Sequence, residues 1–158
     1  MAEKQAVRKQ GESQAIWFLG GLYEVRVSSD ETAGALTVME FTIPEGAGAP
    51  LHTHAQRETV YILEGKARYH VGDEVTEVGP GAVIELPEGV IETFEPVGPL
   101  RMLAIYTPGG IDKFFAEVGE PATERRVPDP ITEPPDFEHL TEVGARYGLQ
   151  LLGPPPRQ

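Results

Sequence analysis

The chain has 158 residues, which is enough for one domain with a buried core. No apolar run approaches the length needed to cross a bilayer, and residues 1–15 lack the apolar segment of a secretory signal. The formal net charge of -12 argues against a nucleic-acid partner, because such binding depends on neutralising phosphates with Lys and Arg. There is no cysteine, which excludes disulfides and thiolate metal sites. We therefore expect a soluble, cytoplasmic protein that binds neither nucleic acid nor membrane.

The chain begins with a polar segment, residues 1–15, which is predicted to be an N-terminal tail. From residue 16 to about residue 106, short runs rich in Val, Ile, Leu, Tyr, Phe and Thr are separated by Gly, Pro and Asp. This pattern is typical of an all-β sandwich or barrel, and several runs, such as "TVMEFTI", alternate apolar and polar residues like a strand with one wet face. The predicted strands are 16–19, 22–28, 35–43, 58–65, 66–72, 74–78, 82–87, 91–96 and 100–107.

The character of the sequence changes after residue 107. The run "IDKFFAEVG" spaces apolar residues at helical intervals and stops at Gly119, so a helix is predicted over 111–119. A Pro-rich connector follows, and a second short helix capped by Asp136 is predicted in "DFEHLTEVGARYGL". We therefore predict three parts: the tail, a β core over 16–107, and a helical and Pro-rich extension over 108–158.

Two histidines one residue apart carry the first chemical signal. In a strand, alternate side chains share a face, so His52 and His54 can point into one cavity, and Glu58 can join them if the chain bends little. Imidazole and carboxylate together suit a divalent ion such as iron, manganese, nickel, cobalt, zinc or copper. Two His and one carboxylate leave open positions for substrate or oxygen, which is typical of a catalytic rather than a closed site.

The surrounding glycines make this signal more specific. The stretch follows the pattern G-x5-H-x-H-x3-E-x6-G, in which the named residues are Gly46, His52, His54, Glu58 and Gly65. This pattern resembles the first motif of the cupin superfamily in full.

A second stretch is similar to the second cupin motif. It follows the pattern G-x5-P-x-G-x2-E, with Gly81, Pro87, Gly89 and Glu92 as the named residues. Most family members have histidine at the position of Glu92. The family's usual asparagine, four residues later, is replaced by Pro96. The framework of the motif is therefore present, and it departs from the family at one metal ligand.

The resemblance covers roughly residues 16–107 and implies an all-β fold, the cupin double-stranded β-helix or jelly-roll barrel, with short C-terminal helices outside it. The chain looks like the single-domain cupins described as quercetin dioxygenase-like. Carried over by position, His52, His54 and Glu58 would be metal ligands, with Glu92 at the fourth position. The implied cofactor is one divalent transition metal ion, with Mn, Fe, Ni or Co favoured over Zn or Cu. Cupins of this kind commonly pair through their sheets, so a homodimer is expected.

Three interpretations of Glu92 stay open at this point. It can coordinate the ion, which would shift preference toward harder ions such as manganese or ferrous iron. It can act beside a three-ligand site as a catalytic general base or acid, with its pKa set by burial, by Glu58 and by the cation. It can also face solvent at the rim of the barrel and leave a weak metal site.

Aromatic and sulfur-containing side chains near the motifs are expected to pack the core, and any that point inward would make the pocket apolar. These residues are Met39, Tyr61, Tyr69, Phe94 and Met102.

The resemblance implies a metal-dependent dioxygenase that acts on a small enolisable or aromatic molecule, with Glu58 and Glu92 as catalytic carboxylates. The first alternative is a non-oxidative isomerase, cyclase or lyase that moves a proton with the same groups. The second alternative is a non-catalytic cupin that binds a small molecule, for which a degraded second motif would be natural.

Overall fold

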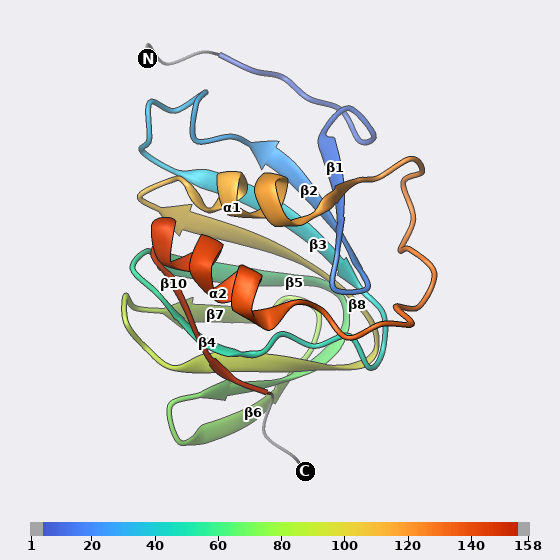
Figure 1. Cartoon of the computed structure of the whole chain (residues 1–158), viewed down its shortest axis with the longest axis vertical. Coiled ribbons are helices and arrows are strands. Elements are labelled where there is room, and N and C mark those ends of the chain that lie inside the picture. The colour runs from blue at the N-terminus through green and yellow to red at the C-terminus, as the bar shows by residue number, and fades with distance from the viewer. Residues whose placement is uncertain (1–4, 155–158) are drawn as a thin grey trace.

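The protein is described here by a computed structural model, which covers residues 5–154. Antiparallel strands form its body, and two short helices that contact each other lie across one side of it (Figure 1). The elements in chain order are β1 (Gln14–Phe18), β2 (Gly21–Val27), β3 (Thr37–Ile43), β4 (Leu51–His54), β5 (Arg57–Val71), β6 (Glu74–Val78), β7 (Val83–Leu86), β8 (Glu92–Thr107), α1 (Ile111–Val118), β9 (Glu120–Pro121), α2 (Phe137–Arg146) and β10 (Leu149–Gly153).

The strands follow the order β10-β4-β8-β3-β2-β1-β9, and β5 pairs with β6, β7 and β8. The sixteen-residue strand β8 connects the whole arrangement, because it pairs with β3, β4 and β5 along different parts of its length. This topology confirms the predicted fold class, an all-β jelly-roll with short helices after it. No helix within residues 5–154 is long and apolar enough to span a membrane.

Two pairs of predicted strands are in fact continuous. The predicted strands 58–65 and 66–72 are one strand, β5, and 91–96 and 100–107 are one strand, β8. Gly65 does not end its strand; it sits where the β5–β8 register shifts, with φ at 80°, and a Cβ there would lie 2.0 Å from the carbonyl oxygen of Pro99. The two strands therefore bend together at an irregularity instead of turning.

The C-terminal extension takes part in the sheet. Strands β9 and β10, which the sequence pattern does not predict, pair with β1 and β4 respectively. Both predicted helices are confirmed, and the side chain of Asp136 caps α2 by accepting a hydrogen bond from the backbone N–H of His139. The division of the chain at residues 15 and 107 stays a prediction.

Part of the predicted N-terminal tail lies against the barrel. Residues 1–4 are outside the described range, whereas Arg8 donates to the carbonyl of Arg26 at 2.6 Å and pairs with Glu31. Ser13 is buried, and Gln14 already begins β1. The segment before residue 16 is thus attached to the first two strands by specific contacts.

An aromatic cluster fixes α1 onto the open end of the barrel. Phe115 stacks on Tyr23 with ring centroids 4.9 Å apart, and Tyr23 packs on Phe41 at 4.7 Å. Phe18 contacts the rings of Phe114, Phe115 and Tyr23 edge-on. Such contacts stabilise the packing beyond the area they bury, so α1 forms part of the wall of the cavity described below.

The predicted core is confirmed at four of its five residues, since Met39, Tyr69, Phe94 and Met102 are buried. The fifth prediction is wrong: Tyr61 is 44% exposed. It lies between buried Val60 and Ile62, and alternation along β5 turns it to the outer face of the sheet.

Candidate metal centre

Strand β4 carries both histidines on its inner face. His52 and His54 are each 7% exposed, and the strand is only four residues long. The Nδ1 atom of His52 lies 2.6 Å from the carbonyl oxygen of Pro50. Because a carbonyl can only accept, Nδ1 carries the proton, and Nε2 is the atom left to face the interior.

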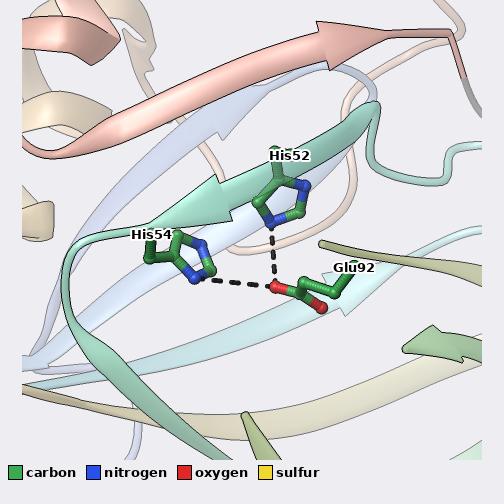
Figure 2. A group of neighbouring side chains, drawn as sticks. All are labelled: His52, His54 and Glu92. Atoms are coloured by element: carbon green, nitrogen blue, oxygen red, sulfur yellow. Dashed lines mark ion pairs between the residues drawn. The ribbon is translucent and has the colours of Figure 1, made fainter. Parts of the chain in front are cut away.

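Glu92 begins β8 directly opposite His52, and the two residues form the only register pair between β4 and β8 among the described residues. Its Oε1 atom lies 2.9 Å from Nε2 of His52 and 3.6 Å from Nδ1 of His54, as Figure 2 shows. One ligand atom from each of the three side chains lies within 4.8 Å of the others, so this buried group could hold a metal ion. Glu92 is 2% exposed, which excludes the alternative in which it faces solvent.

Glu58 lies next to this group, on β5. Its Oε2 atom is 3.3 Å from Nδ1 of His54, and the residue is 4% exposed. Within residues 5–154, this oxygen is buried without a hydrogen-bond partner. The structure therefore brings all four predicted ligand residues together, but Glu92 is the carboxylate that contacts both imidazoles, whereas Glu58 contacts only His54.

The two histidines differ in how readily they take a proton. Burial, and then the charge of the neighbouring His52, lower the pKa of His54 to about 4, while the charge of Glu92 acts in the opposite direction. Burial also acts to lower the pKa of His52, but its hydrogen bond to Glu92 and the charge of that carboxylate outweigh burial and raise the pKa. His54 is thus neutral, with a free lone pair available for a metal ion.

The two carboxyl groups also differ in pKa: the pKa of Glu58 is raised and that of Glu92 is lowered. Burial, and then the charge of Glu92, raise the pKa of Glu58 well above its ordinary value. Burial would raise the pKa of Glu92 as well, but the hydrogen bond and the charges of the histidines outweigh burial and lower it. Glu58 accordingly holds a proton that it shares with Glu92.

This donor set fits a divalent cation. Two buried carboxyl groups in contact need a proton or another cation between them, and the unpartnered Oε2 of Glu58 faces the same space. Imidazole nitrogen and carboxylate oxygen are ligands that iron, manganese, nickel and cobalt accept, and ligands of these types release protons when a metal binds. His52, His54 and Glu92 would hold the ion, with Glu58 as a neighbouring fourth group.

A cavity of about 60 Å³ lies over this group, which is room for roughly two water molecules. Apart from the four site residues, its walls are apolar or aromatic. The aromatic wall residues are Phe18, Tyr23, Phe41, Phe94, Tyr106, Phe114 and Phe115. The other wall residues are Leu19, Ala49, Pro50, Ile111, Leu140, Leu149 and Leu151. No Lys or Arg lines this cavity within the described residues, so neither of these side chains offers a positive charge to an anionic substrate there.

Sequence reasoning missed Tyr106, which lies at the site next to Glu58. Its hydroxyl hydrogen-bonds to Glu58 and lowers the pKa of that carboxyl, against the larger effect of burial. A signal was present, because Leu100, Met102, Ala104 and Tyr106 alternate along β8 and all four are buried.

Comparison with known proteins supports the fold described above. Residues 39–106, which contain both motifs, match the family model described as a cupin domain. An uncharacterized protein of Streptomyces coelicolor, SCO3923, is 31% identical over 74 residues, which are 46% of this chain and 70% of that protein. The chain belongs to the cupin superfamily.

Two solved structures show the same fold. One is an RmlC-like cupin from Shewanella frigidimarina, with a TM-score of 0.61 and 16% identity, covering 71% of this chain and 99% of that one. The other is the polyketide cyclase RemF from Streptomyces resistomycificus, with a TM-score of 0.59 and 21% identity, covering 66% of this chain and 80% of that one.

Proposed function

We propose that this chain is a metal-dependent cupin enzyme that acts on a small, neutral, enolisable or aromatic molecule, with dioxygenation as its reaction. The observation that carries the proposal is the buried group of His52, His54 and Glu92 at one end of a cavity with aromatic walls. Metal sites with few protein ligands keep positions open for substrate, whereas structural sites are closed.

Each site residue has a role that follows from its place. His52, His54 and Glu92 hold one divalent ion, for which Mn, Fe, Ni or Co are the candidates. Bound there, the ion would supply Lewis acidity to a substrate oxygen. Glu58 lies beside the group. With the ion in place of the proton that Glu58 shares with Glu92, its unpartnered oxygen would take the proton that the substrate loses from its hydroxyl group or its enolisable carbon.

The walls of the cavity set the chemical class of the substrate. Aromatic rings from β1, β2, β3, β8 and α1 favour a flat apolar molecule, and they exclude water from the proton transfer. The cavity is too small for a bicyclic molecule, so its wall must move outward when the substrate binds.

Dioxygenation adds both atoms of one O2 molecule to the substrate and needs no external reductant. Oxygen uptake should be measured with a panel of flavonols and other enolisable aromatics, on protein loaded with each candidate metal. One O2 consumed per substrate supports the proposal, and a Glu58→Gln variant should retain metal but lose most turnover. Full turnover without oxygen would rule dioxygenation out.

A non-oxidative reaction is the second candidate. It is favoured by one observation, the likeness of the fold to a structure named as a polyketide cyclase. A carboxylate that moves a proton suffices for an isomerase, cyclase or lyase, and the same residues would act. Conversion of substrate under strict exclusion of oxygen, with an isomeric or smaller product, would identify this class.

The non-catalytic alternative predicts that metal is not required. Protein purified without added metal should be analysed for transition metals, before and after reconstitution. Less than about a tenth of an equivalent in both cases would exclude both enzyme proposals, because ligand sets of this type bind metal when folded.

Homodimer assembly and a cytoplasmic location stay predictions. Size-exclusion chromatography with light scattering tests the first. Phe18, an apolar residue at the end of β1, packs against Phe114 and Phe115 of α1 in the same chain. We therefore do not expect Phe18 to contact a partner subunit.

A further inference from the structure

The strand that carries both histidines has little support from the barrel itself. Strand β4 pairs with β8 at a single position, His52 opposite Glu92. On its other side it pairs with β10 at His54, Thr53 and His52, opposite Leu149, Gln150 and Leu151. Most of the backbone pairing that fixes β4 thus comes from the last strand of the chain, almost 100 residues later.

The turn after His54 is attached to the same C-terminal segment. The backbone N–H of Ala55 donates to the carbonyl of Gly148 at 2.7 Å, and the side-chain amide of Gln56 donates to the carbonyl of Tyr147 at 2.9 Å. Gln56 is 8% exposed and lies midway between His54 and Glu58 in the sequence. Its hydrogen bond therefore holds the turn that separates two of the site residues.

The contact at Gly148 leaves no room for a side chain. Gly148 has φ at 78°, and a Cβ there would lie 2.8 Å from the Cβ of Ala55 and 3.3 Å from the amide nitrogen of Gln56. A side chain at this position would push the turn after His54 away from the segment. The close approach of the two backbones depends on this glycine.

The C-terminal segment, residues 137–153, is in turn fixed to α1. Arg146 pairs with Glu117 at 2.6 Å, and the hydroxyl of Tyr147 donates to the other oxygen of Glu117 at 2.7 Å. Leu149 and Leu151 of the same segment also line the cavity, and they are the pairing partners of His54 and His52 on the neighbouring strand. The C-terminal segment therefore pairs with β4 through β10 (Figure 1) and also supplies part of the cavity wall.

We propose that the C-terminal segment is the positioning element of the metal centre, that Gln56 is the positioning residue through which it holds the ligands, and that metal binding and docking of the segment stabilise each other. The inference rests on the proposed metal site. By linkage, anything that loosens the docked segment weakens metal binding, and bound metal strengthens docking by the same free energy.

The first test changes Gln56 alone. Gln56→Met keeps the length of the side chain and removes the donor to Tyr147, so Co(II) affinity should fall about tenfold, as for other residues that orient ligands. The absorption spectrum of the bound Co(II) should also shift, which a loss of stability alone would not cause. The control is Gln150→Ala, an exposed position on β10, which should leave affinity and spectrum unchanged. Unchanged affinity and spectrum in Gln56→Met would overturn the proposal.

The second test needs no variant. Hydrogen exchange of the wild-type protein should be compared with and without saturating Co(II). Backbone amides of residues 149–153 should exchange more slowly when metal is bound, although none of them is a ligand. Protection confined to β4, β5 and β8 would contradict the coupling.

These outcomes separate the inference from the proposed function. If the wild-type protein binds no Co(II) under reconstituting conditions, the proposed metal site fails. If the wild-type protein binds Co(II) and Gln56→Met binds it equally well, only the positioning role fails.

Discussion

Glu92 occupies a position where the cupin motif usually has histidine, and its effect is local and electrostatic. The carboxylate reaches both imidazoles from directly across the sheet, and it raises the pKa of His52. A site with two imidazoles and this carboxylate would carry one positive charge less than a three-histidine site around the same divalent ion. Such a site would be a weaker Lewis acid and would favour harder ions.

Substitution of Glu92 separates its charge from its shape. Glu92→Gln should lower Co(II) or Mn(II) affinity by at least about tenfold, because it removes the anionic ligand and keeps the side-chain size. Glu92→His should restore a nitrogen ligand and stoichiometric metal. The measurement is metal content and dissociation constant by competition with a chelator. Glu85→Gln, on the outer face of β7, is the control, and equal affinity in all variants would exclude Glu92 as a ligand.

The close approach of the backbone to Gly65 leads to a prediction about the stability of the fold. Gly65→Ala should destabilise the fold by about 3 kcal/mol, because its Cβ would lie 2.0 Å from a backbone oxygen of Pro99. Gly81→Ala is the control: its φ of 88° is similarly unfavourable for alanine, but nothing lies near the added carbon, so a loss of about 1 kcal/mol is expected. Urea unfolding checks both values, and equal losses would show that the bend tolerates a side chain.

The four candidate ligand residues could be predicted from spacing, but their geometry could not. Regular alternation predicts that His52 and His54 share a face, and this is what β4 shows. The pairing of His52 with Glu92 depends on register between strands almost 40 residues apart, which no local pattern specifies. Gln56 was missed for the same reason, because its partner Tyr147 lies 91 residues later in the chain, whereas Tyr106 could have been found from the alternation along β8.

At the scale of elements, most strands of the barrel could be predicted from the sequence, but β4, β9 and β10 could not. Runs of β-branched and aromatic residues indicated every strand from β1 to β8 except β4, whose "LHTH" is too short and polar to give a period. Gly65 and residues 97–99 were predicted to be breaks between strands, although β5 and β8 continue through them with shifted register. Strand β10 follows α2 after one positive-φ glycine, Gly148, and only its first residue, Leu149, lies in the stretch predicted to be helical; the other residues of β10 were not predicted to form a strand.

The attachment of the N-terminal segment should depend on pH. Glu31 accepts hydrogen bonds from Arg8, Ser28 N–H and Ser28 Oγ, and these contacts lower the pKa of its carboxyl. A lowered pKa means that the contribution to stability is complete above the ordinary value of 4.5 and is lost as pH falls through the folded value.

The substitution Glu31→Gln tests this attachment. It should cost about 1 kcal/mol at neutral pH, and the difference from the wild type should shrink as the pH falls below the ordinary pKa of glutamate. Denaturant unfolding of both proteins across the acid range measures this difference. The control is Glu133→Gln, at an exposed position in the Pro-rich connector before α2, and its stability should equal that of the wild type at every pH. A constant difference at all pH values would mean that the charge of Glu31 is not what matters.

At the scale of the whole molecule, the barrel supplies the candidate ligands and the C-terminal extension supplies part of the cavity wall around them. Residues from β1, β2, β3, β4, β5, β8, α1, α2 and β10 all reach the cavity, so segments from both ends of the chain meet there. A ligand that binds only the folded state should therefore stabilise the molecule as one unit.

Removal of metal should lower the melting temperature. At a free metal concentration of about 100 times Kd, binding adds about 2.7 kcal/mol to the free energy of unfolding. For a chain of this size that free energy corresponds to an increase of roughly 5–10 °C. Differential scanning calorimetry of chelator-treated and reconstituted protein measures the difference. A His54→Ala variant should show no increase, and the same increase in that variant would place the ion elsewhere.

The absence of Lys and Arg from the cavity lining of the described residues also has a consequence for product release. Under the proposed function, a neutral aromatic substrate would enter a space that holds two carboxyl groups and apolar walls. If ring cleavage gives the product a carboxylate of its own, that charge would meet the proposed metal ion but no Lys or Arg, and the two carboxyl groups would offset part of the charge of the ion. Acidic products should therefore inhibit the proposed enzyme only weakly, and their departure should not limit turnover.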